Sequence, residues 1–143
     1  MSKKRVRKSP KYENLLFLII PLVFILDRVV KIYAKDSCFG VFCFQRALNE
    51  GAAFGLLPGK TLLLIVVGVF VLLLILSIYK KSSLEVKIAL LLIAAGTLSN
   101  MYDRVIYSAV TDVLSVFGSS SFNVADLSNV SGAIILIKSL IKK

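Results

Sequence analysis

The chain has 143 residues, 57% of them hydrophobic, and its mean hydropathy is +0.86. Soluble domains contain roughly 45 to 50% apolar residues, so this composition excludes an ordinary soluble enzyme and indicates a membrane protein. The formal net charge is +10. The basic residues are not interleaved with stacking aromatic residues on a soluble motif, so we do not expect nucleic acid as a partner.

Four segments are predicted to span a membrane, at residues 14–34, 61–79, 86–106 and 123–141. The second contains nineteen residues without a charge, and a helix of that length matches a hydrocarbon layer of about 30 Å. A buried core helix is the alternative for one such segment, but a chain this short could not bury four. We therefore predict an all-α membrane protein, a four-transmembrane-helix bundle in a single domain.

The basic residues predict the orientation of these spans. Six precede the first span, three surround the turn between the second and third, and three lie at the C-terminus, against six in the remaining parts of the chain. By the positive-inside rule, both termini are expected in the cytoplasm, with residues 1–13 as a basic cytoplasmic leader. No small-residue cleavage site follows the first apolar run, so we expect a retained span and not a cleaved signal peptide.

Two outer segments, residues 35–60 and 107–122, connect the spans on the extracytoplasmic side. Residues 38–47 are rich in aromatic and branched side chains, so they are predicted to be strand-like and to rest at the membrane surface. Cys38 and Cys43 could form a disulfide there, but two reduced, buried thiols are our expectation. Asp112 has apolar neighbours and is expected to be partly buried, with a turn leading back to Asp126.

Acidic residues are concentrated at the outer side. Only Glu13 and Glu85 belong to the cytoplasmic side, and the others belong to the outer ends of spans or to the outer segments. An ionisable side chain at the edge of a membrane span is costly, and it therefore indicates a functional site. The outer acids are Asp27, Asp36, Glu50, Asp103, Asp112 and Asp126.

The residue types present restrict the chemistry. The chain has no histidine, which excludes a Ser-His-Asp or Cys-His nucleophilic site and histidine-ligated zinc. A Ser-Lys pair remains an alternative, using Lys60 with Ser115 or a serine at 119–121. An oxygen-only divalent-cation site formed by Asp103, Asp112 and Asp126 is a second alternative.

Asp112 and Asp126 form the best candidate for a reactive pair. If the turn between them brings the carboxyl groups to about 3 Å, both cannot be ionised together, and the pKa of one is raised. The ionised member could then take a proton from water while the protonated member polarises a peptide carbonyl. Such a pair would hydrolyse peptides with neither a metal nor a cofactor.

Five motifs occur along the chain in a recognisable order: DRVVK (27–31), NEGAAFG (49–55), GTLSNMYDR (96–104), VTDVL (110–114) and FNVAD (122–126). Together they resemble the lipoprotein signal peptidases, also called signal peptidase II, over residues 14–141. This resemblance implies an aspartyl endopeptidase of the cell membrane that cuts a prolipoprotein just before its diacylglyceryl-modified cysteine. It implies no cofactor and no metal.

The resemblance also assigns roles to individual residues. Asp112 and Asp126 match the catalytic pair. Substrate-binding positions correspond to Asn49, Gly51, Asn100, Arg104 and Asn123, and structural or supporting positions to Asp27, Lys31 and Asp103. The chain departs from the family at Arg28, where glutamine is usual. The implied partners are a lipid-modified prolipoprotein and membrane lipids, and we expect the protein to be a monomer with its active site near the extracytoplasmic face.

Two other functions fit a small membrane bundle with acidic residues. A proton- or solute-conducting bundle would use intramembrane acids as relays, but it should place them at several depths, and the cytoplasmic halves of these spans lack them. The second alternative is a catalytically inactive homologue. The presence of both aspartates argues against it.

Overall fold

The structure is a computed structural model that describes residues 13–52, 56–116 and 121–142. Most of the predicted leader, residues 1–12, lies outside the described residues. The elements of the described part are α1 (Glu13–Leu16), α2 (Ile19–Tyr33), β1 (Ser37–Phe39), β2 (Phe42–Asn49), α3 (Thr61–Tyr79), α4 (Leu84–Tyr107), β3 (Val110–Val116) and α5 (Val124–Ile141).

The long helices agree closely with three of the predicted spans. The bounds of α3 coincide with the predicted 61–79, and α4 and α5 begin or end within two residues of their predicted bounds. In the described residues, these three helices are long and apolar enough to cross a membrane. The predicted bundle of four such helices is therefore not confirmed.

The first predicted span, 14–34, is divided into two helices. A turn at Phe17 and Leu18 separates α1 from α2, which has 15 residues. Pro21 explains the interruption, because it has no N–H to donate to the Phe17 carbonyl and proline fits best in the first turn of a new helix. The C-terminal half of α2 also carries Asp27, Arg28 and Lys31, which lower its hydropathy.

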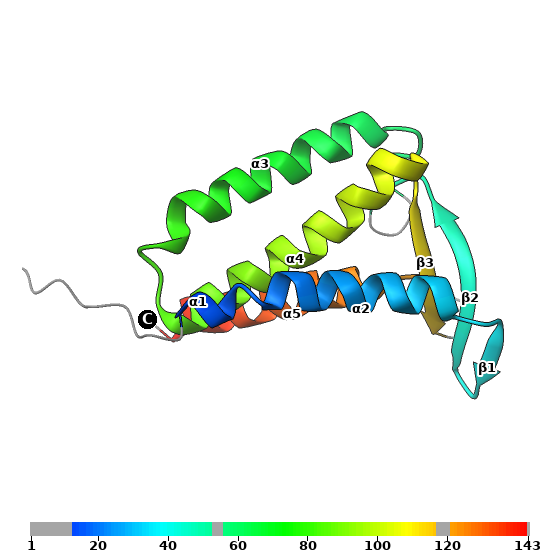
Figure 1. The fold of residues 1–143 in the computed structure, drawn as a ribbon, viewed down its shortest axis with the longest axis horizontal. Coiled ribbons are helices and arrows are strands. Elements are labelled where there is room, and N and C mark those ends of the chain that lie inside the picture. Colours follow the sequence, from blue (N-terminus) through cyan, green and yellow to red (C-terminus); the bar gives the residue numbers. More distant parts are fainter. Residues whose placement is uncertain (1–12, 53–55, 117–120, 143) are drawn as a thin grey trace, which may run out of the picture.

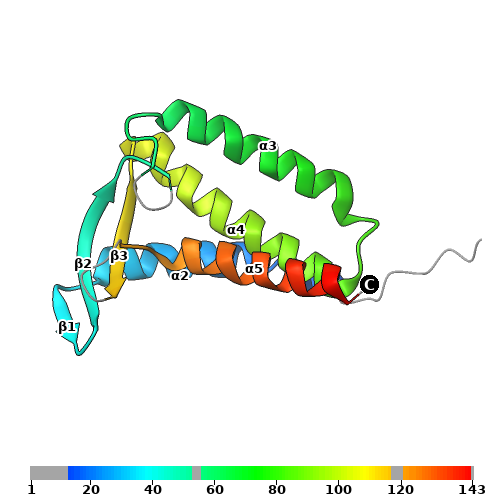
Figure 2. The ribbon, with the colours of Figure 1, turned by 180° about the vertical axis from the view of Figure 1, so that it is seen from behind.

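The helices run alongside one another, and the sheet closes one end of the bundle (Figures 1 and 2). The opposite end holds α1, the turn between α3 and α4, and the C-terminal end of α5. Helix α4 is central, since α2, α3 and α5 all pack against it. Buried side chains of α3 and α4, namely Ile75, Leu90 and Ala94, form a core between these two helices.

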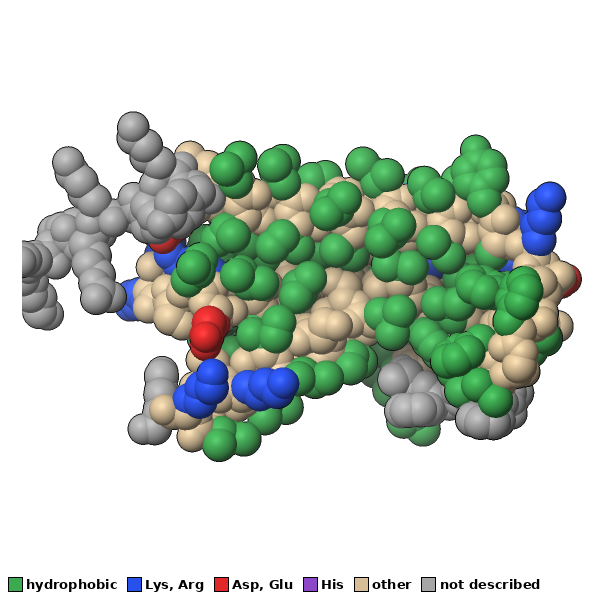
Figure 3. Space-filling view, turned by 90° about the horizontal axis from the view of Figure 1, so that it is seen from below, with side chains coloured by type: hydrophobic (Ala, Val, Ile, Leu, Met, Phe, Trp, Pro, Cys, Tyr) green, Lys and Arg blue, Asp and Glu red, His purple; other side chains and the backbone are tan. Residues whose placement is uncertain are grey.

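The lipid-facing character of the bundle is visible on its surface. Hydrophobic side chains cover the middle of the face in Figure 3, and most of the charged side chains seen there lie toward its two ends. Helix α3 is the most exposed of the long helices, with large apolar side chains such as Leu62, Phe70 and Leu76 pointing outward. Such a surface is unfavourable in water and favourable in lipid.

The outer segments form a three-stranded antiparallel sheet in the order β1-β2-β3. The predicted strand at 38–47 is confirmed, and it consists of two strands, β1 and β2, joined by a tight turn with Gly40 at a φ of +61°. Strand β3 was not predicted. Its sequence, VTDVLSV, is rich in β-branched residues, and this composition is the signal that would have indicated a strand.

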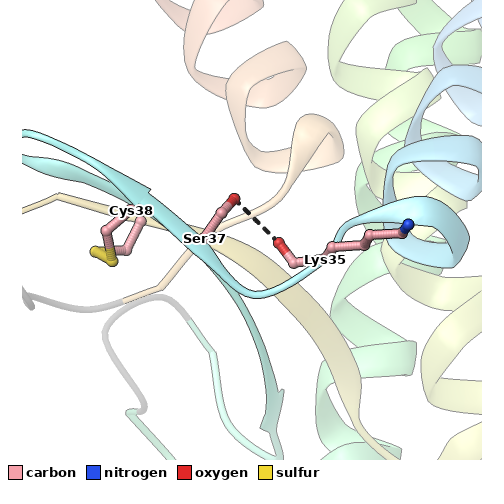
Figure 4. The surroundings of a disulfide bond; sticks show 4 residues. Lys35, Ser37 and Cys38 are labelled. Atoms are coloured by element: carbon pink, nitrogen blue, oxygen red, sulfur yellow. Dashed lines mark hydrogen bonds between the residues drawn. A yellow bond between two sulfur atoms is a disulfide. The ribbon is translucent and has the colours of Figure 1, made fainter.

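Cys38 and Cys43 form a disulfide, so the expectation of two reduced thiols was wrong. The hairpin register makes these two residues direct partners, with their Cα atoms 4.1 Å apart. Residues facing each other across an antiparallel pair bring their side chains together, which makes this bridge geometrically accessible. Figure 4 shows the surroundings, where the Ser37 hydroxyl donates a hydrogen bond to the Lys35 carbonyl at 3.2 Å.

Candidate active site

Asp112 and Asp126 both line a cavity of about 430 Å³ at the sheet end of the bundle. The wall combines parts of α4, α5 and β3 with the segment that follows β2. Its residues are Asn49, Ala52, Asn100, Arg104, Val110, Asp112, Ser121, Phe122, Asp126, Leu127, Asn129 and Val130. The two aspartates, 14 positions apart in the sequence, thus face a single space.

Asp126 is fixed in the first turn of α5 by a reciprocal cap. The Asn123 side chain is the N-cap and accepts a hydrogen bond from the Asp126 N–H at 2.8 Å, while Asp126 Oδ2 accepts one from the Asn123 N–H at 3.1 Å. Asn100 on α4 donates to the other oxygen, Oδ1, at 2.8 Å. Because both oxygens are held, the orientation of this carboxylate is set before any substrate binds.

Asp112 lies on β3 and its residue is only 1% exposed, which confirms the predicted burial. Asn123 donates to its Oδ1 at 2.8 Å, and Asn49 at the end of β2 donates to its Oδ2 at 3.2 Å. Burial raises the pKa of Asp112 to about 6, the Asp126 carboxylate adds to the rise, and the two asparagine hydrogen bonds oppose it. Buried Asn123 is thus the side chain that contacts both aspartates.

The segment after β2 is tied to the same site. The Asn49 side-chain oxygen accepts a hydrogen bond from the Gly51 N–H at 2.9 Å, and the Gly51 carbonyl accepts one from Arg104 Nη2 on α4 at 3.1 Å. Arg104 lines the cavity, which places a cation beside the two carboxylates. Gly51 and Asn123 are buried and do not line the cavity, so they lie behind its wall.

A second polar cluster lies between α2 and α4. Lys31 Nζ is 2.7 Å from Asp27 Oδ2 and 2.8 Å from Asp103 Oδ2. Arg28 also bridges both acids, with its Nη2 2.7 Å from Asp27 Oδ2 and its Nη1 in contact with Asp103. The charges of the cluster balance, since it contains two acidic and two basic side chains, and both carboxylates are fully buried.

This cluster is connected to the backbone beside each candidate catalytic residue. Asp27 Oδ1 accepts a hydrogen bond from the N–H of Ala125 at 3.1 Å, and Asp103 Oδ2 accepts one from the N–H of Thr111 at 3.1 Å. Ala125 and Thr111 each immediately precede one of the two aspartates. The cluster therefore holds both segments that carry the cavity carboxylates against α2 and α4.

Arg28 and Ser99 are members of this cluster that sequence reasoning did not assign to it. The Ser99 hydroxyl donates to Asp27 Oδ2 at 2.6 Å, and the Arg28 guanidinium lies against the rings of Phe24 and Tyr102, 5.5 and 5.1 Å from their centroids. The sequence did contain a signal that Arg28 belongs to this cluster. Arg28 and Lys31 are three residues apart, so they lie on neighbouring positions of one helical face.

The two alternative chemistries receive no structural support in the described residues. Lys60 precedes α3 and is exposed, Ser115 lies on β3 opposite Cys43, and no hydrogen bond within the described residues connects them. The serines at 119 and 120 lie outside the described residues. Asp103 faces Lys31 and Arg28. Within the described ranges, no group of three or more His, Cys, Asp or Glu side chains is arranged to hold a metal ion.

Two glycines allow α4 and α5 to approach closely, one at the site and one far from it. A Cβ on Gly96 would overlap the Ala125 carbonyl oxygen and Asn129, which flank Asp126. A Cβ on Gly132 would lie 2.6 Å from the Ala89 carbonyl oxygen, nearer the other end of the bundle. Both helices thus need small residues at their contact.

We expect Gly96→Ala to displace the start of α5 and to lower the turnover rate by about tenfold to 10²-fold, because small misplacements of catalytic groups are costly. Gly132→Ala is the matched control, since it overpacks the same pair of helices by a similar amount, about 1 to 3 kcal/mol. Thermal unfolding and cleavage assays in detergent measure both effects. Equal rate losses in the two variants would show that the site does not depend on the Gly96 contact.

The fold resembles that of known bacterial membrane enzymes. Two solved structures described in those words align with TM-scores of 0.84 and 0.81, each at 26% sequence identity and over 92% of this chain. The alignments cover 90% and 96% of the respective structures. The fold therefore defines a multi-pass membrane enzyme.

The sequence comparisons identify the family. Residues 19–142 match the family described as signal peptidase (SPase) II. A lipoprotein signal peptidase of Clostridium novyi is 34% identical over 88% of this chain and 97% of its own length, and one of Halothermothrix orenii is 34% identical over 86% and 92%. The chain belongs to the signal peptidase II family. It is a membrane protease of the aspartic type for which this family is known.

Proposed function

We propose that this protein removes the signal peptide from diacylglyceryl-modified prolipoproteins, cutting just before the lipidated cysteine, with Asp112 and Asp126 as the catalytic pair. The observation that carries the proposal is the arrangement of these two carboxylates on one cavity, each held by asparagine donors and linked through Asn123. Family membership supports the substrate class.

The resting protonation of the pair follows from its surroundings. In the active form we assign the shared proton to Asp112, because burial and the neighbouring Asp126 carboxylate raise its pKa to about 6, so it keeps a proton to higher pH than an ordinary aspartate. Asp126 is the ionised member, because the Asn123 N–H and the Asn100 side chain both donate to its carboxylate and the positive end of the α5 dipole lies beside it.

The reaction then proceeds by general acid-base catalysis. Asp126 takes a proton from a water molecule as the oxygen attacks the scissile carbonyl carbon, and Asp112 gives its proton to the carbonyl oxygen. The tetrahedral intermediate collapses when Asp126 passes its proton to the leaving nitrogen and Asp112 regains its own. The products are the signal peptide, with a new carboxyl terminus, and the lipoprotein, with a free amino terminus on its cysteine.

The polar residues around the pair divide into two roles. Asn49, Asn100 and Arg104 line the cavity and are the groups that contact the substrate backbone or the lipid ester. Gly51 and Asn123 are buried and do not line the cavity. Gly51 accepts a hydrogen bond from Arg104, and Asn123 holds the two aspartates. Asp27, Lys31 and Asp103 support the site through the backbone of Ala125 and Thr111.

We also propose that α1, its following turn and α2 together make a fourth crossing. Residues 13–33 would extend about 30 Å if fully helical, which matches the hydrocarbon layer. The start of α1, the basic turn between α3 and α4 and the end of α5 share one end of the bundle, and we assign this end to the cytoplasm. The site is then extracytoplasmic. All of its groups come from one chain, so we propose that it works as a monomer.

The test of this function is cleavage of a purified prolipoprotein by the purified protein in detergent. We expect a diacylglyceryl-modified substrate to be cut before its cysteine, with the site identified by mass spectrometry. The same substrate without the lipid should be cut at least tenfold more slowly, because the proposed reaction depends on lipid contacts. Absence of cleavage of the modified substrate would contradict the assignment.

A further inference from the structure

A second cavity, of about 600 Å³, lies between α2, the C-terminal end of α4 and the sheet. None of its lining residues belongs to the first cavity. Arg28, Lys31 and Arg46 provide all of its charged lining side chains, and Phe24, Tyr102 and Tyr107 provide its aromatic ones. The proposed protease chemistry uses none of this space.

The charge that this cavity presents is positive. Asp27 and Asp103, which pair with Arg28 and Lys31, are fully buried and do not line it. Arg46 is exposed, its guanidinium donates to the Ile32 carbonyl at the end of α2, and it takes part in none of the ion pairs found in the described residues. Arg28 Nε is buried without a hydrogen-bond partner there. Every charged side chain that lines the cavity is therefore a cation, and the charge of Arg46 is offset by none of the ion pairs in the described residues.

Apart from Thr111 and the tyrosine hydroxyls, the rest of the cavity wall is apolar, and it continues onto the exposed surface of α2. Leu48 is 72% exposed and Ile32 is 61% exposed, and both line the cavity. The exposed residues Ile25 and Val29 extend this apolar surface along α2, away from the sheet. Tyrosines such as Tyr107 are typical of the level where the hydrocarbon layer meets the headgroups. The cavity therefore combines a cationic pocket beside tyrosines with an apolar surface that continues along α2.

We propose that this cavity binds an anionic phospholipid, with the lipid phosphate at Arg46 and Arg28 and the acyl chains along the exposed face of α2. A phosphate is the shared chemistry of a lipid headgroup and a soluble phosphate, but only a lipid also uses the apolar surface. Arg46 suits this role because it is exposed and a planar guanidinium can donate to two phosphate oxygens at once, while Arg28, whose Nη atoms pair with Asp27 and Asp103, adds positive charge beside it.

Native mass spectrometry of the detergent-solubilised full chain tests the proposal. Three probes are added separately: dioleoyl phosphatidylglycerol, dioleoyl phosphatidylcholine and soluble glycerol phosphate. We expect the anionic lipid to give at least fivefold more one-to-one complex than the other two, since each basic residue near the headgroup favours an anionic lipid by about that factor. Equal binding of the two lipids, or equally tight binding of glycerol phosphate, would overturn the proposal.

Arg46→Gln localises the site without disturbing the buried cluster, because glutamine can still donate to the Ile32 carbonyl. We expect this variant to bind phosphatidylglycerol about fivefold more weakly, and Arg46→Lys to recover part of the loss. Lys60→Gln is the matched control, since it removes an exposed positive charge near the start of α3 and should leave binding unchanged. Equal losses in Arg46→Gln and Lys60→Gln would show general attraction to a basic protein, and would overturn the assignment to this cavity.

Discussion

We expect Asp126→Asn to lower kcat/KM by about 10⁴-fold and Asp112→Asn to lower it by at least about 10²-fold. The first change removes the base that activates water. The second keeps a neutral polar group of the same shape but no transferable proton, so some polarisation of the substrate carbonyl remains. Rates of prolipoprotein cleavage under conditions limited by kcat/KM measure both losses.

Asp36→Asn is the control for these substitutions, because Asp36 is an exposed acid between α2 and β1 and does not line the cavity. It should leave the rate within about twofold of the unchanged protein. Thermal unfolding must show that the variants at 112 and 126 remain folded. A folded variant at either position that cleaves at the normal rate would remove that aspartate from the mechanism.

Asp27→Ala is expected to destabilise the protein by about 3 kcal/mol, because removing one partner leaves a buried cation inadequately compensated. Lys31 and Arg28 would share Asp103 alone, and the Ala125 N–H would lose its acceptor. Activity should fall as a consequence, through loss of the folded form and displacement of Asp126. Unfolding in detergent, followed in parallel with cleavage, measures the two effects.

Asp27→Asn separates stability from positioning. Its side-chain oxygen can still accept the Ala125 N–H, so it should retain more activity per folded molecule than Asp27→Ala. If Asp27→Ala were as stable as the unchanged protein and yet inactive, Asp27 would take part in the chemistry and its assignment as a supporting residue would be wrong.

The helical part of the fold could be predicted well because it depends on local signals. The uncharged run at 61–79 gave the bounds of α3 without tertiary information. The break before α2 could not be found by counting apolar residues, since it depends on the missing N–H of Pro21. Strand β3 was missed because a strand needs a partner, and the pairing of residues 110–116 with β2 is a long-range contact.

The site could be predicted in its composition but not in its connections. Asp112 and Asp126 could be singled out as candidates because a carboxylate among apolar residues is costly and therefore conspicuous in a sequence. Asp27 and Asp103 accept hydrogen bonds from the backbone N–H groups of Ala125 and Thr111. Every residue except proline has such a group, so the sequence does not indicate which ones form these bonds. The disulfide was misjudged because its formation depends on the hairpin register and not on the two cysteines alone.

The pH dependence of kcat/KM tests the central claim, that Asp112 and Asp126 share one proton, most directly. We expect a bell-shaped profile in which activity falls as the pH rises through about 6, because burial raises the pKa of Asp112 to that value and its proton is then lost. Asn49→Ala removes a hydrogen bond that lowers this pKa, so its alkaline limb should lie at higher pH. A rate that is constant or still rising above pH 6 would contradict a shared proton.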